Sequence, residues 1–110
     1  MNSIPERDWK VFREMHGTLM ERFCGRVLEE VARAATNPKR EASERFFTVA
    51  KLMDERAKDV NDLGDHRRST AFFVIARMYD REKLFLPGEF EQFSQETRDQ
   101  IQRLRSLWKD

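Results

Sequence analysis

Three residues able to bind soft metal ions stand four positions apart near the start of the chain: His16, Met20 and Cys24. On a helix this spacing puts all three on one face, where they could share a copper or zinc ion. Zinc sites, however, use denser spacings of Cys and His, and Met and Cys are ordinary core residues. We therefore expect these three residues to be packing residues, and we expect no metal and no other cofactor.

The densest polar cluster is Asp65-His66-Arg67-Arg68-Ser69-Thr70, at the start of a predicted helix. Two arginines in a first helical turn oppose the helix dipole, which favours acidic groups there. One interpretation is an ion pair between Arg68 and an acidic residue of a neighbouring helix, and we favour it because most charged clusters are solvated or locally paired. The other is an anion-binding site formed by Arg67, Arg68 and Ser69 together with free backbone N–H groups.

No pattern in the chain indicates catalysis. His16 and His66 are the two histidines, and neither belongs to a Glu-x-x-His pair. The chain has no Gly-x-Ser-x-Gly sequence and no glycine-rich phosphate loop. Glu29 and Glu30 are adjacent, so on a helix they point about 100° apart, which does not suit a shared acid–base pair. We expect no enzymatic activity and no catalytic residues.

Charge is plentiful but balanced, with 21 Lys and Arg against 20 Asp and Glu among 110 residues. Nucleic-acid-binding proteins usually carry a basic stripe, and none is visible, so we do not expect a nucleic acid partner. The single Cys24 excludes an internal disulfide and suits a reducing compartment. With no stretch of about 20 apolar residues and no apolar leader at the N-terminus, we expect a cytoplasmic protein that does not enter a membrane.

Apolar residues recur at helical spacing between three short breaks, at Asn37-Pro38, Leu63-Gly64 and Leu86-Pro87-Gly88. This layout predicts an all-α fold: a compact, bundle-like single domain of four helices, at roughly 4–35, 38–62, 66–84 and 94–108. A short turn carrying Phe90 and Phe93 precedes the last helix. The predicted boundary residues are Ser3 with Glu6, Asn37 with Pro38, Gly64, Asp65 or Ser69, and Ser94.

The first helix has more apolar surface than a monomeric bundle can cover. Its apolar positions, from Trp9 to Val31, span about 220° of the circumference, whereas an outer helix needs about 100–160°. Residues 70–79 are apolar nearly all round. Such a surplus predicts a partner surface, and we expect a homodimer with the first and third helices at its centre. The predicted interface residues are Trp9, Phe12, His16, Met20, Phe47 and Phe73.

Two glycines interrupt the first helix, Gly17 and Gly25, and each costs about 0.5–1 kcal/mol relative to alanine. Close approach of another helix would explain them, and so would simple tolerance. At the other end of the chain, Trp108 is too apolar for a frayed tail. We expect it to pack against the first or third helix and to close the bundle.

The sequence alone does not identify a function, but it orders three hypotheses. The first is a non-enzymatic helical module for protein–protein interaction that homodimerises, with room for another protein partner. The second is a regulatory nucleic-acid-binding protein in which the helix beginning at Arg67-Arg68 meets phosphates. The third is a bundle that binds a small molecule or an anion at Arg67, Arg68 and Ser69.

Overall fold

The computed structural model describes residues 3–65 and 67–108, and over these residues it contains helices and turns but no strand. The all-α prediction is therefore confirmed. In chain order the elements are α1 (Glu6–Ala35), α2 (Ala42–Leu63), η1 (Arg68–Thr70), α3 (Ala71–Ala76), η2 (Arg77–Arg81), η3 (Phe90–Gln92) and α4 (Gln95–Trp108). Here η1 and η3 are 3₁₀ turns, and η2 is a π-helical turn that continues α3.

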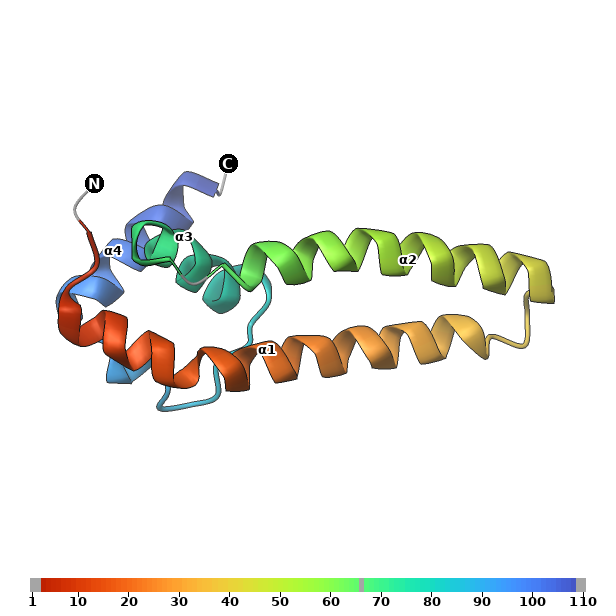
Figure 1. Cartoon of the computed structure of the whole chain (residues 1–110), viewed down its shortest axis with the longest axis horizontal. Helices are drawn as coiled ribbons and strands as arrows, with labels where there is room; N and C mark the ends of the chain where they lie inside the picture. Colours follow the sequence, from red (N-terminus) through yellow and green to blue (C-terminus); the bar gives the residue numbers. More distant parts are fainter. Residues whose placement is uncertain (1–2, 66, 109–110) are drawn as a thin grey trace.

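The helices form an arm and a cap (Figure 1). α1 and α2 run antiparallel as a long hairpin, and α3, α4 and their connections gather at the end where α1 begins and α2 ends. α1 packs mainly on α2, and α3 packs mainly on α4. A bundle with all four helices side by side is thus not confirmed, and the expected central pairing of the first and third helices is wrong. The molecule is elongated, at 51 × 31 × 24 Å.

The core lies where the cap meets the first two thirds of α1. Its buried apolar side chains are Ile4, Phe12, Leu19, Phe23, Val27, Leu63, Ala71, Phe72, Val74, Ile75, Ala76, Met78, Leu84, Phe90, Phe93, Ile101 and Leu104. All of α3 except Phe73 is buried, which explains its nearly continuous apolar sequence. α2 contributes only Leu63, so the end of the hairpin that carries the turn has no covering layer.

Two predicted helix starts are wrong. α1 begins at Glu6 after Pro5, and Ser3 lies before the helix without capping it. α2 begins at Ala42 rather than at residue 38. The Oδ1 atom of Asn37 accepts a hydrogen bond from the backbone N–H of Lys39, so Asn37 organises the turn that reverses the chain. An Asn-Pro pair favours such a turn as readily as a helix start, because the Asn side chain can bond to the backbone two residues on.

The boundaries of the third helical segment also differ from the prediction. It begins at Arg68 as a 3₁₀ turn and ends at Arg81, and His66 lies outside the described residues. Asp65 accepts a hydrogen bond from the backbone N–H of Arg67, but neither Asp65 nor Ser69 caps the segment. Gly64 does end α2, with a right-handed φ of −72° instead of the left-handed geometry typical of a terminating glycine.

The last helix begins and packs close to the prediction. The Ser94 Oγ accepts the backbone N–H of Thr97 at 3.3 Å, so Ser94 is the cap of α4. Phe90 and Phe93 are buried on the preceding turn, as expected. Trp108 lies partly buried against the core and beneath the Arg81 guanidinium of η2, 5.1 Å from its ring centre. Trp108 therefore contacts η2, the segment that continues α3.

Candidate interaction surface

α2 carries an apolar stripe that the fold leaves in solvent. Its members are Ala42, Phe46, Ala50, Met53 and Ala57, and all are exposed. Phe46 keeps 67% of its surface accessible and Met53 keeps 42%. The spacings of 4, 4, 3 and 4 residues hold the stripe on one side of the helix. The side of α2 that meets α1 is a different one, marked by Leu52, Arg56 and Leu63, which are partly or fully buried.

The second half of α1 carries a matching stripe. Cys24, Leu28, Val31 and Ala35 follow one another at spacings of 4, 3 and 4 residues. Leu28 is 63% exposed, Ala35 is exposed, and Cys24 and Val31 are half-buried. The side of α1 that meets the core and α2 is marked by Phe23 and Val27, which are buried. α1 therefore also directs an apolar row away from its contact with α2.

The two stripes lie on the same side of the hairpin. Successive residues of a helix are 100° apart, so each stripe lies about a quarter turn away from the side of its helix that faces the other helix. The quarter turn has the same direction on both helices when each is viewed from its own N-terminus. Because the helices are antiparallel, equal rotations bring both stripes to one face. At the far end of the hairpin, Ala35 of α1 lines a shared groove with Ala42, Phe46 and Val49 of α2, and Arg45 lies at its edge toward α1. We call the nine residues of the two stripes the apolar face.

No charged residue of 22–35 or 42–60 falls within the apolar face, although 37% of the whole chain is charged. The opposite face of the hairpin is polar. It has a groove lined by Glu30, Ala34, Thr48, Lys51, Leu52 and Glu55. The nine residues of the apolar face are thus gathered on one side of the hairpin, and the groove on the other side is lined mostly by polar side chains.

The residues predicted for a dimer interface are dispersed by the fold. Phe12 is a core residue with no accessible surface, so its side chain cannot meet a second copy. Trp9 and Met20 are partly buried against the same core. The Nε2–H of His16 donates a hydrogen bond to the backbone carbonyl oxygen of Leu63 at 2.9 Å, which ties α1 to the end of α2.

Two of the predicted interface residues remain accessible. Phe47 is 68% exposed and its ring meets that of Phe46 edge-on at 5.3 Å, so it borders the apolar face. Phe73 is 50% exposed and lies at the cap end of α2, in a groove with Asn61 and Arg77. The signal that could have located the apolar face is the pair of charge-free stripes in residues 24–35 and 42–57.

The predicted anion-binding residues have partners within the chain. Arg67 donates three hydrogen bonds to the Asp65 carboxylate at 2.9–3.3 Å, and the side chain and backbone of Arg67 hold the pKa of Asp65 below its ordinary value. The Nε and Nη2 atoms of Arg68 donate to the carbonyl oxygen of Ile4, and its Nη1 meets Glu6 of α1 at 3.2 Å. The contact between Arg68 and Glu6 is an ion pair with a neighbouring helix, which is the interpretation that we favoured from the sequence. Ser69 is exposed.

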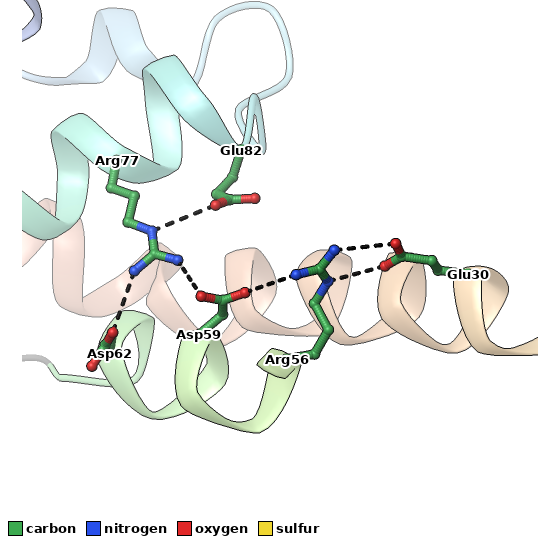
Figure 2. A network of polar contacts seen from close by, with 6 residues as sticks. All are labelled: Glu30, Arg56, Asp59, Asp62, Arg77 and Glu82. Atoms are coloured by element: carbon green, nitrogen blue, oxygen red, sulfur yellow. Dashed lines mark hydrogen bonds and ion pairs between the residues drawn. The ribbon is translucent and has the colours of Figure 1, made fainter. Parts of the chain in front are cut away.

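A charged network joins the cap to the hairpin on the polar side (Figure 2). Arg77 of η2 contacts the carboxylates of Asp59 at 2.7 Å and of Asp62 and Glu82 at 3.5 Å. Asp59 also meets Arg56, whose guanidinium donates two hydrogen bonds to Glu30 of α1. Arg56 thereby lowers the pKa of Glu30. The network ties the cap to α2 and α2 to α1, and the sequence pattern did not predict it.

A second polar cluster ties α4 to the first turn of α1. Asp8 has no accessible surface, and its carboxylate accepts hydrogen bonds from the Ser94 N–H and Oγ and from the Thr97 Oγ1 at 2.6–2.8 Å. Burial raises the pKa of Asp8, but these hydrogen bonds, with the nearby Arg7, bring it below its ordinary value. Over the described residues, no group of three His, Cys, Asp or Glu side chains is placed to hold a metal ion.

Replacing Gly25 by alanine should stabilise the protein. Gly25 lies inside α1, and an added Cβ would meet no atom within 4 Å. Alanine should therefore raise the free energy of unfolding by about 0.5–1 kcal/mol, because it restricts the unfolded chain and favours the helix. Urea denaturation of Gly25→Ala beside the unmodified chain measures this. A loss of stability would mean that another surface packs closely on this side of α1.

Comparison of the chain with protein-family models, curated proteins and solved structures finds no match. Among the helices over residues 3–65 and 67–108, none combines the length and the apolar character needed to cross a membrane.

Proposed function

We propose that this chain is a non-enzymatic helical interaction module that homodimerises through the apolar face of the α1–α2 hairpin. The observation that carries the proposal is the charge-free apolar face itself, exposed on a hairpin in which about half of the other side chains are charged. Contiguous exposed apolar surface on a soluble chain is typical of an interface. A cytoplasmic location, in keeping with the unpaired Cys24, belongs to the same proposal.

A second copy fits this surface in size and chemistry. The apolar face is about 20–25 Å long at 1.5 Å per residue and about two helix diameters, or 20 Å, wide. Two copies together would bury about 800–1,000 Å², the size of a small, weak interface. Packing two hairpins face to face would turn two uncovered helix pairs into one four-helix unit with a shared apolar centre.

The nucleic-acid and anion hypotheses receive less support, because the arginines that they need are engaged within the chain. Arg67 and Arg68 meet Asp65 and Glu6. On α4, Arg98 donates to the carbonyl oxygen of Phe93, and Arg105 donates to Asp80 at 2.6 Å. Phosphate binding at these positions would have to displace the internal partners.

Matched substitutions on the two faces of α2 test the proposal. Ala50→Glu places a charge in the apolar face, and Thr48→Glu places the same charge on the polar face of the same helix; both positions are exposed. Each should change the stability of the single chain by no more than about 0.5 kcal/mol. Ala50→Glu should convert the dimer to a monomer, because the dimer would bury an unpaired carboxylate.

Multi-angle light scattering gives the mass of each variant, and circular dichroism confirms that it is folded. If Thr48→Glu dissociates the dimer as readily as Ala50→Glu, the apolar face is not the interface. If both variants and the unmodified chain are monomers, the module does not homodimerise.

A further inference from the structure

Most of the α1–α2 hairpin is folded without a fully buried side chain. From Leu28 through the turn to Asp62, every residue is exposed or half-buried. We infer that this segment, which we call the outer arm (residues 28–62), unfolds locally for a substantial part of the time in a single chain and becomes fully ordered when a second copy covers the apolar face. This inference rests on the proposed homodimer and adds that dimerisation is coupled to folding.

The core does not depend on the outer arm. All of its buried apolar side chains come from residues 4–27 and 63–104. Burial of apolar surface is the main favourable term in folding, so the outer arm can open while the core stays intact. Opening would break the contacts of Arg77 with Asp59 and Asp62, but Glu82, which belongs to the cap, stays beside Arg77.

The contacts that hold the outer arm together are accessible to solvent. The apolar side chains between its two helices are at most half-buried. The Arg56 guanidinium meets Glu30 at 3.0 Å, and near the turn Arg45 donates a hydrogen bond to the Ala35 carbonyl oxygen at 2.7 Å. Such accessible polar contacts contribute little to stability, and a short helix with little tertiary packing is marginal in water.

The two ends of α2 add little stability to the outer arm. Among the described residues, none caps the N-terminus of α2 with a side chain, and Glu41 occupies the capping position, where Ser, Thr, Asp and Asn are favoured. The last turn of α2 holds no basic residue and includes Asp62, whose charge is unfavourable at the negative end of the helix dipole. The helix therefore depends on what packs against it.

A second copy would supply the layer that the outer arm lacks. All residues of the apolar face except Cys24 belong to the outer arm, so covering this face stabilises the outer arm directly. Because the partner binds the ordered form and not the open one, ordering of the outer arm and dimerisation are linked equilibria. Any change that stabilises the ordered outer arm should then tighten the dimer, even where it touches no partner residue.

Substitutions at Glu41 test this coupling without altering the apolar face. Glu41 already has the extended backbone of a capping residue, with φ −65° and ψ 157°, and it lies outside the apolar face. Glu41→Ser supplies a hydroxyl that can accept a backbone N–H from the first turn of α2. Glu41→Ala is the matched control, because it removes the same charge and supplies no acceptor.

Sedimentation equilibrium gives the dissociation constant of each variant. A capping serine favours a helix about fivefold over alanine, and each dimer contains two outer arms. Glu41→Ser should therefore have a dissociation constant about 3–25-fold lower than that of Glu41→Ala. Equal dissociation constants would overturn the inference and leave the homodimer in place. If both variants and the unmodified chain are monomers at every concentration, the proposed function fails and the inference fails with it.

Hydrogen exchange supplies a second readout that does not depend on capping by serine. In the Ala50→Glu monomer, backbone amides of residues 46–58 should exchange roughly 100-fold faster or more than those of residues 19–27, which lie in the part of α1 that the core covers. In Thr48→Glu, which keeps the dimer, the same amides should exchange more slowly above the dissociation constant than below it. Equal protection of the two segments in the monomer would overturn the inference, even if the dimer forms.

Discussion

Asp8→Ala should lower the free energy of unfolding by about 3 kcal/mol or more, since removing one partner of a buried charged network leaves the others unsatisfied. The Ser94 N–H, the Ser94 hydroxyl and the Thr97 hydroxyl all donate to this carboxylate. Urea denaturation at neutral pH measures the loss. Asp54→Ala is the matched control, because Asp54 is exposed and its nearest cation, Lys58, is 3.9 Å away; its effect should stay within about 0.5 kcal/mol.

The same carboxylate should make stability depend on pH in the acid range. Because the pKa of Asp8 is lower in the folded chain than its ordinary value, ionised Asp8 stabilises the fold above the unfolded-state pKa of about 3.9. That contribution is lost as the pH falls through the folded-state value. Stability measured from neutral pH down to the acid range should therefore fall less steeply in Asp8→Asn than in the unmodified chain. Equal slopes would show that Asp8 does not titrate in this way.

Removal of residues 94–110 should abolish cooperative folding. α4 contributes Ile101 and Leu104 to the core, and it packs mainly on the almost completely buried α3. The truncation would also leave Asp8 buried without Ser94 and Thr97. We expect a chain that aggregates or binds a hydrophobic dye and lacks a sharp thermal transition.

A substitution at the exposed end of α4 serves as the control for this truncation. Leu107 is 74% exposed, so Leu107→Ser should leave the melting temperature nearly unchanged. If the truncated chain melts cooperatively at the temperature of the unmodified chain, α4 is an appendage and not part of the core.

Helix positions were predictable because the apolar period is a local property. The two long helices and α4 occupy nearly the predicted residues, and the Ser94 cap was identified from its place before an amphipathic segment. The start of α2 was misplaced because Asn37-Pro38 can open either a turn or a helix, and the choice depends on how the chain reverses between the two long helices.

The polar clusters could not be predicted, because their partners are far apart in the sequence. Asp8 meets residues 86 and 89 positions away, and Arg77 meets Asp59 across two elements. In the sequence, an Asp in a first helical turn is sufficiently explained by its favourable interaction with the helix dipole. Its burial becomes apparent only when α4 docks on it.

The interface prediction was limited for a related reason. The wide apolar arc of the first helix mixed two sides, one that the cap buries around Phe12 and one that stays exposed around Leu28. Sequence periodicity measures how much apolar surface a helix has, but it does not say which part the chain itself covers. The exposure of the apolar stripe on the second helix, from Ala42 to Ala57, became apparent only in the fold.

The mass of the intact chain in solution tests the central claim most directly. Sedimentation equilibrium over a series of micromolar concentrations should give a mass twice the 13.2 kDa of one chain, with dissociation on dilution. A mass of one chain at every concentration would contradict the proposal that the apolar face of the hairpin holds a second copy.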